Sequence, residues 1–132
     1  MHQRLALILQ GSPLAMTDSL LKGYLEAALF GDLDEEFIGK VKLKDFTDEA
    51  VAEAAVVCDV FCGEWRDQIA EHNWDFHRAG RDLWLTRNEH GSGFWDGDWG
   101  EELGEKLTHA AHAFGRCTLH VDENLQLHFI EG

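Results

Sequence analysis

Carboxylates and histidines gather in the second half of the chain, and their types and spacing could serve metal chemistry. Asp96 and Asp98 resemble the opening of a calcium loop, but Gly100 stands where the third ligand belongs, which excludes an EF-hand. His109 and His112 are three residues apart and share one helix face. His120 and His128 share one face of a predicted sheet, and a zinc site would need three or four of these histidines brought together with an acid such as Asp96. One hypothesis is therefore a small metal-dependent enzyme that uses Asp96, Asp98, His109 and His112.

No other catalytic signature is complete. The glycine-rich turn at residues 91–93 fits neither the dinucleotide-binding nor the phosphate-loop spacing, and the acids around it would repel a phosphate. Cys58 and Cys62 lie four residues apart among apolar neighbours, and with Cys117 they make an odd number, so we expect three buried, reduced thiols. No serine lies on a nucleophile elbow. The sequence favours a protein that is not an enzyme and that has no cofactor.

Charge is the strongest signal in the composition. The 132 residues include 25 Asp and Glu against 11 Lys and Arg, a net charge of −14. Such a field repels nucleic acid and acidic membrane surfaces and attracts basic proteins. We expect a basic host protein or a nucleoprotein complex as the partner, with no direct binding to nucleic acid or membrane. The alternative is a negative surface that serves only solubility.

The acids expected to contact this partner lie on the first two predicted helices and just before and at the start of the third. Trp84 joins them, because it should face away from Leu83 and Leu85 on a strand and so reach the surface. A homodimer formed through Trp84 is a further alternative. The candidate partner-binding residues are Glu26, Asp32, Asp34, Glu35, Glu36, Glu49, Glu53, Trp84, Asp96, Asp98, Glu101 and Glu102.

Two long helices should organise the first half of the chain. Thr17 is placed to cap a helix over residues 18–30, with apolar side chains at three- and four-residue spacing. Thr47 caps the second helix, which carries an unbroken apolar seam and ends near Asn73. The wide apolar face of this second helix indicates the domain core rather than a coiled-coil seam.

A hairpin and a third helix should follow. Residues 83–86 predict a strand, and residues 94–95 predict its return after a turn. Asp98 and Glu101 have the spacing of a capping box that begins the third helix, and Gly115 is placed to end it.

The C-terminal residues predict a second hairpin with a turn at residues 122–124. Its register puts the apolar side chains on one face and Thr118, His120, Gln126 and His128 on the other. The facing pairs are Val121 with Leu125, Leu119 with Leu127, and Cys117 with Phe129.

These elements together predict an α+β fold with about three helices packed on a small antiparallel sheet built from hairpins. Residues 16–132 should form a single domain, and residues 1–15 a leader or extension. The apolar run at residues 5–9 is too short for a signal-peptide core or a membrane span, so we expect a cytoplasmic protein in a bacterial host.

Two segments carry a family resemblance. AGRDLWLTRNEHGSGFWD (79–96) and GEELGEKLTHAAHAFG (100–115) resemble segments of an uncharacterised family of small phage, prophage and plasmid proteins, whose members read AGHDFWLTRNGHGAGFWDRG and then LGDRLTEAAKAFG. The segment GYLEAALF (23–30) is similar to YIECALW in those proteins, and the resemblance covers about residues 17–129. This chain departs from the family pattern at Arg81, which is usually His, and at Glu89, which is usually Gly.

The resemblance implies an accessory protein of a mobile element. Small acidic phage proteins are often inhibitors of host defence, and some present carboxylates where the target expects phosphates. The leading hypothesis is an inhibitor of the anti-CRISPR or anti-restriction type that acts as a DNA mimic through its negative surface.

Overall fold

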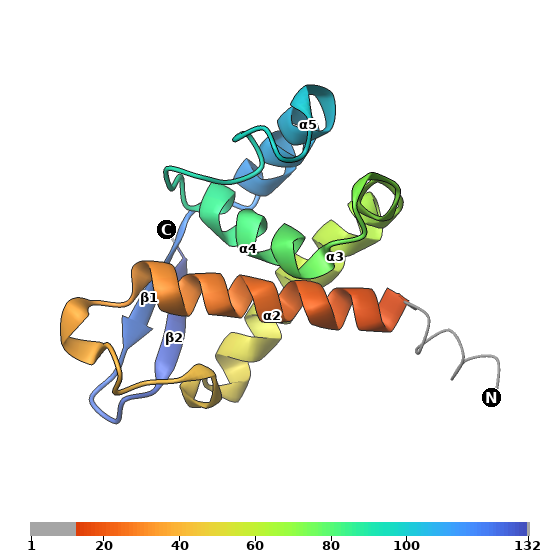
Figure 1. Cartoon of the computed structure of the whole chain (residues 1–132). Helices are drawn as coiled ribbons and strands as arrows, with labels where there is room; N and C mark the ends of the chain where they lie inside the picture. Colours follow the sequence, from red (N-terminus) through yellow and green to blue (C-terminus); the bar gives the residue numbers. More distant parts are fainter. Residues whose placement is uncertain (1–12, 132) are drawn as a thin grey trace, which may run out of the picture.

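The computed structural model describes residues 13–131, which form four α-helices and a small C-terminal sheet that lies to one side of them (Figure 1). This confirms the α+β class, with one helix more than predicted. Most of the predicted leader, residues 1–15, lies outside the described residues. No described helix is both long and apolar enough to span a membrane. The elements are α2 (Pro13–Asp32), the 3-10 turns η1 (Glu35–Phe37) and η2 (Leu43–Asp45), α3 (Asp48–His72), α4 (Phe76–Arg87), α5 (Glu101–His112), β1 (Cys117–Val121) and β2 (Leu127–Glu131).

Helix α4 overturns the prediction of a strand and hairpin between residues 83 and 95. The Asp75 carboxylate caps this helix by accepting a hydrogen bond from the Arg78 backbone N–H at 2.9 Å. Trp84, expected at the surface, is fully buried. A run of three apolar residues at 83–85 is too short to distinguish a strand from a buried helix segment.

Helix α4 is held in place by a close crossing with α2 at two glycines, Gly23 and Gly80. A Cβ atom on Gly80 would overlap the Leu20 carbonyl oxygen and would lie 2.9 Å from the Tyr24 backbone nitrogen. A Cβ atom on Gly23 would likewise overlap the His77 carbonyl group. Both positions therefore need glycine, because the two helix backbones touch there.

Helix α3 follows the prediction. The Thr47 hydroxyl accepts a hydrogen bond from the Ala50 backbone N–H at 3.0 Å, and Asn73 ends the helix. Helix α2 instead begins at Pro13, a residue suited to a first helical turn, so the predicted cap at Thr17 is wrong.

The predicted capping box of α5 is also wrong. Gly100, with a φ of +80°, is the N-cap residue and makes no side-chain cap, while the Asp98 carboxylate is paired with Arg78. Gly115 has a φ of +75°, the left-handed conformation expected of the residue that ends this helix.

The C-terminal hairpin has the predicted faces but a register shifted by two residues. Val121 faces Leu127, and Leu119 faces Phe129. The loop is longer than expected because the Asp122 carboxylate accepts hydrogen bonds from the backbone N–H groups of Asn124 and Gln126, both at 2.9 Å. A shift of two keeps every side chain on its predicted face.

The core lies between α2, α3 and α4, and the hairpin closes one side of it (Figure 1). Tyr24, Trp84 and Phe129 meet in one aromatic group, and Phe61, Phe94 and Trp99 in another. All three cysteines are buried and free, as predicted.

Candidate functional site

The polar residues that end α4 hold the fold together. The Arg87 guanidinium, 3% exposed, donates hydrogen bonds to the Tyr24 hydroxyl at 2.7 Å and to the Gly115 carbonyl at 2.6 Å, and it pairs with the Glu131 carboxylate at 2.8 Å. It thereby links α4 to α2, to the end of α5 and to β2. Such a fully engaged arginine is a structural residue rather than a free ligand for a substrate.

Thr86 and Asn88, on either side of Arg87, fix the neighbouring chain segments. The Thr86 hydroxyl accepts a hydrogen bond from the Phe94 backbone N–H at 3.0 Å, and a Cβ atom on Gly93 would overlap that hydroxyl. The Asn88 side-chain oxygen accepts from the Cys117 backbone N–H at 2.8 Å. The TRN segment of the family-like motif is thus explained by packing.

Asp82 is a buried carboxylate within the same helix. Its Oδ2 atom accepts a hydrogen bond from Trp99 Nε1 at 2.7 Å, and Arg81 and Arg78 lie 3.4 Å and 3.8 Å from its oxygens. Burial raises the pKa of Asp82, and the hydrogen bond from Trp99 and the two arginines offset this only in part. These contacts of Asp82 orient Trp99 and α4.

The two candidate acids on α2, Glu26 and Asp32, are engaged within the fold. Asp32 Oδ2 accepts a hydrogen bond from Trp84 Nε1 at 2.5 Å and lies 3.0 Å from His90 Nε2. Glu26 pairs with His77 at 2.7 Å. Both are only partly exposed, so they offer less to a partner than the sequence suggested.

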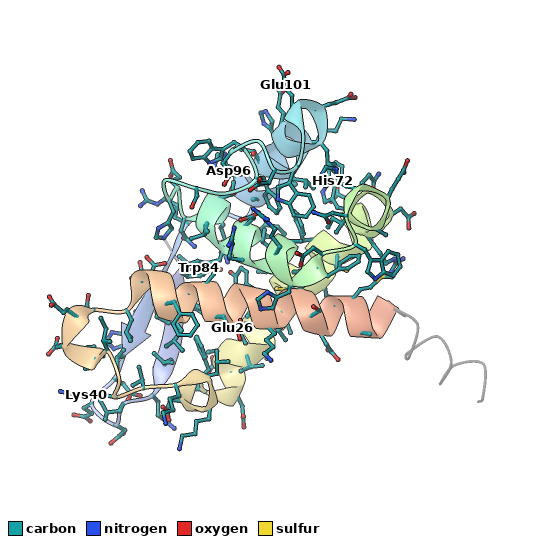
Figure 2. The ribbon with its side chains drawn as sticks, viewed as in Figure 1. Glu26, Lys40, His72, Trp84, Asp96 and Glu101 are labelled. Carbon is teal, nitrogen blue, oxygen red and sulfur yellow. The ribbon has the colours of Figure 1, made fainter. Side chains whose placement is uncertain are left out.

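The other candidates lie at different ends of the molecule. Asp34, Glu35 and Glu36 are exposed at η1, just before Lys40, and Lys40 lies at the opposite end from Glu101 (Figure 2). Asp96, Glu101 and His72 all lie in the half of the molecule that contains α5 (Figure 2). The predicted acids therefore form at least two separate surfaces.

The geometry required by the metal-dependent alternative is not found. In residues 13–131, no group of three or more His, Cys, Asp and Glu side chains is arranged to hold a metal ion. Asp98 is paired with Arg78, and the Asp96 carboxylate accepts a hydrogen bond from the Gly93 backbone N–H at 3.3 Å. His109 and His112 are exposed on α5, and neither forms a metal-binding group with Asp96 or Asp98 in the described residues.

The largest concentration of available carboxylates is on α3. This helix carries seven acids against one base, Arg66, and all seven acids are exposed. At 100° per residue they occupy about 160° of arc, opposite the buried side. None of them is in an ion pair within the described part of the chain. They are Asp48, Glu49, Glu53, Asp59, Glu64, Asp67 and Glu71.

A cleft of about 570 Å³ joins this helix face to the start of α5. Glu71 and His72 of α3 line one side, and Glu101 and Glu102 of α5 line the other. Of these four residues, Glu102 is the one with an ion pair in the described part of the chain, to Lys106 at 3.5 Å, and His72 Nε2 lies 2.9 Å from the Asp98 carbonyl oxygen. We call the seven α3 carboxylates together with Glu101 and Glu102 the acidic face.

Comparison with known proteins is negative. No family model, curated protein or solved structure matches the chain. The resemblance to phage and plasmid proteins remains a prediction.

The acidic face was predicted only in part. Glu49, Glu53, Glu101 and Glu102 were predicted, whereas the other five acids of this face were missed: Asp48, Asp59, Glu64, Asp67 and Glu71. The three- and four-residue spacing of these later acids was a usable signal, since it puts them on the side of the helix opposite the apolar seam. Their meeting with α5 is a tertiary feature that no local pattern reveals.

Proposed function

We propose that this protein is a non-catalytic binding protein whose acidic face occupies the basic nucleic-acid-binding surface of a partner protein. The setting implied by the family resemblance makes a host defence complex, of the CRISPR or restriction type, the partner class. The observation that carries the proposal is the set of seven exposed carboxylates on one side of α3, without ion pairs in the described residues.

The charge density of α3 supports imitation of a single nucleic-acid strand. A helix of 25 residues is about 37 Å long at 1.5 Å per residue, so seven carboxylates give one charge per about 5 Å. One strand of B-DNA carries a charge every 3.4 Å or so along its axis, and a full turn is about 34 Å long. Glu101 and Glu102 extend the acidic face beyond the α3 carboxylates.

Contacts that the fold already uses further restrict the surface. Glu26 and Asp32 serve internal hydrogen bonds, and Asp98 is neutralised by Arg78. A partner would lose little by leaving them out, because an ion pair that is already made must be broken before it serves a new contact. The proposal therefore concerns the acidic face and not every acid of the chain.

The test is capture from a bacterial lysate treated with nuclease, over a salt series and with duplex DNA as competitor. We expect nucleic-acid-binding proteins to be retained at about 50 mM salt and largely released at about 200 mM, because a surface that engages several cationic groups loses affinity steeply with salt. Duplex DNA should release the same proteins. Retention that DNA leaves unchanged would contradict the proposal.

A charge-matched pair of variants separates binding from mere solubility. The variant Glu64→Gln, Asp67→Asn, Glu71→Gln removes three charges from the acidic face, and Asp34→Asn, Glu35→Gln, Glu36→Gln removes three from η1. If both variants retain the partner proteins equally, then the total negative charge matters and its position on the acidic face does not.

A further inference from the structure

A second groove lies on the other side of the first turn of α5, and Trp95 forms one of its walls. The groove encloses about 410 Å³. It shares only Gly100 and Glu101 with the α3–α5 cleft. We call it the Trp95 groove, and its lining residues are Trp95, Gly97, Gly100, Glu101, Gly104, Glu105, Thr108 and His109.

Trp95 contributes little to the core. Its side chain is 54% exposed, whereas Trp84 and Trp99 are fully buried and donate hydrogen bonds to carboxylates. The described residues include no ring partner within stacking distance of Trp95. A tryptophan so placed gains burial only when something covers it, and tryptophan is among the residues that contribute most at binding surfaces.

The charge of the groove selects a cation. Glu101 and Glu105 are four residues apart, so they lie on the same side of α5, and both are exposed and make no ion pair in the described residues. The only other titratable side chain in the lining is His109. The N-terminal end of α5 would favour an anion through its helix dipole, but Glu101 and Glu105 already supply negative charge there. A bound anion would therefore be repelled by these two carboxylates.

The shape of the groove suits a flat, narrow group. Gly97 and Gly100 leave open space where a side chain would stand, and their φ angles of +102° and +80° favour glycine. Gly104 is different, because a Cβ atom there would lie 2.6 Å from the Phe94 carbonyl oxygen. Three of the eight lining residues are thus glycines, and the largest side chain in the lining is the indole of Trp95.

We propose that the Trp95 groove takes an arginine side chain of the basic partner, with its guanidinium over the indole and its N–H groups donating to Glu101 and Glu105. This inference rests on the proposed function and names the residue type that the acidic region recognises. Arginine is preferred to lysine because a planar guanidinium both stacks on an aromatic face and binds carboxylates in a bidentate manner. A second copy of this chain, with its own net charge of −14, does not complement the groove.

The test uses the full chain and two fluorescein-labelled hexapeptides, hexa-arginine and hexa-lysine, followed by fluorescence anisotropy at low salt. We expect hexa-arginine to bind more tightly than hexa-lysine. Trp95→Ala should weaken hexa-arginine binding about fivefold, the size of a partly desolvated cation–π contact, and Trp95→Phe should restore part of the loss. Trp74→Ala is the matched control, because Trp74 is similarly exposed at 51% but lies outside the groove.

The outcomes separate this inference from the proposed function. If hexa-arginine binds and Glu64→Gln, Asp67→Asn, Glu71→Gln weakens it while Trp95→Ala does not, the groove is not the site and the acidic face stands. If the wild-type protein binds neither peptide, both proposals fail. Circular dichroism of Trp95→Ala and Trp74→Ala establishes that a lost signal is not lost folding.

Discussion

The crossing of α2 and α4 provides a stringent test of the fold, through the substitution Gly80→Ala. In the native packing, the new Cβ atom would overlap the Leu20 carbonyl oxygen and would lie 2.7 Å from the Leu20 carbonyl carbon. Carbon atoms in good contact are about 3.5–4.0 Å apart, so the helices must separate by at least about 1 Å, and the nearer carbonyl oxygen requires more. Overpacking of this kind costs about 1–3 kcal/mol, and a clash between backbones belongs at the upper end because no side chain can rotate away.

The control for Gly80→Ala is Gly63→Ala, the same change in the middle of another helix. A Cβ atom on Gly63 would meet nothing within 4 Å, and Gly63 is exposed. Alanine is the better helix former by about 0.5–1 kcal/mol, so this variant should be more stable than the wild type.

Thermal unfolding followed by circular dichroism measures both glycine variants. A domain of this size shifts its Tm by about 3–5 °C per kcal/mol, so Gly80→Ala should melt about 10 °C lower and Gly63→Ala about 3 °C higher than the wild type. Equal melting temperatures would refute the argument, because they would mean that the two helices do not meet at Gly80. The helical assignment of α4 would then lose its main support.

Two further predictions concern buried polar groups. Burial raises the pKa of Asp82, so ionising this carboxyl destabilises the folded state. The destabilisation is absent below the ordinary carboxyl pKa and reaches its full size once the pH has risen through the raised pKa. Asp82→Asn keeps an acceptor for Trp99 Nε1, and its free energy of unfolding in urea, relative to the wild type, should therefore be higher at pH 7 than at pH 4; a gap that narrows with rising pH would contradict this. Arg87→Met should cost about 2–4 kcal/mol in urea unfolding, because it leaves buried hydrogen-bonding groups unpaired, whereas Glu131→Gln, at a carboxylate 70% exposed, should cost under about 1 kcal/mol. Similar losses of stability in Arg87→Met and Glu131→Gln would mean that β2 is held by the ion pair with Glu131 and not by the other hydrogen bonds of Arg87.

Secondary structure was predicted correctly where residues close in the sequence determine it. Helix α3 is bounded by a threonine cap at one end and Asn73 at the other, with a continuous apolar seam between them, so both ends were predicted. The two faces of the C-terminal hairpin also followed from alternation. Its register did not, because Asp122 closes a longer loop through its own side chain and a shift of two residues leaves the pattern unchanged.

Helix α4 could not be predicted from pattern, because its stability is tertiary. Gly80 is unfavourable in an isolated helix and is needed only for contact with α2. Asp82 and Arg87 look like surface residues until Trp99 and Tyr24 are known to meet them. The same cause removed Trp84 from the candidate surface, since Asp32, 52 residues earlier, accepts its indole N–H.

The candidate binding surface was likewise predictable where helical spacing determines it and not where tertiary contacts do. Acids on α3 were recognisable from helical spacing, although only Glu49 and Glu53 were selected. Whether an acid outside α3 is free to contact a partner depends on residues far away in the sequence. Glu26 is hydrogen-bonded to His77, and Asp98 forms an ion pair with Arg78. Net charge alone therefore overstated the number of carboxylates free to meet a partner.

The central claim is that the position of the negative charge, and not its total, makes this protein a binding protein. The most direct measurement is the affinity of a captured partner, or of hexa-arginine, for two variants that each lose three charges. We predict that Glu64→Gln, Asp67→Asn, Glu71→Gln weakens binding about tenfold and flattens its salt dependence, whereas Asp34→Asn, Glu35→Gln, Glu36→Gln stays within about twofold of the wild type. Equal affinities for the two variants would contradict the account.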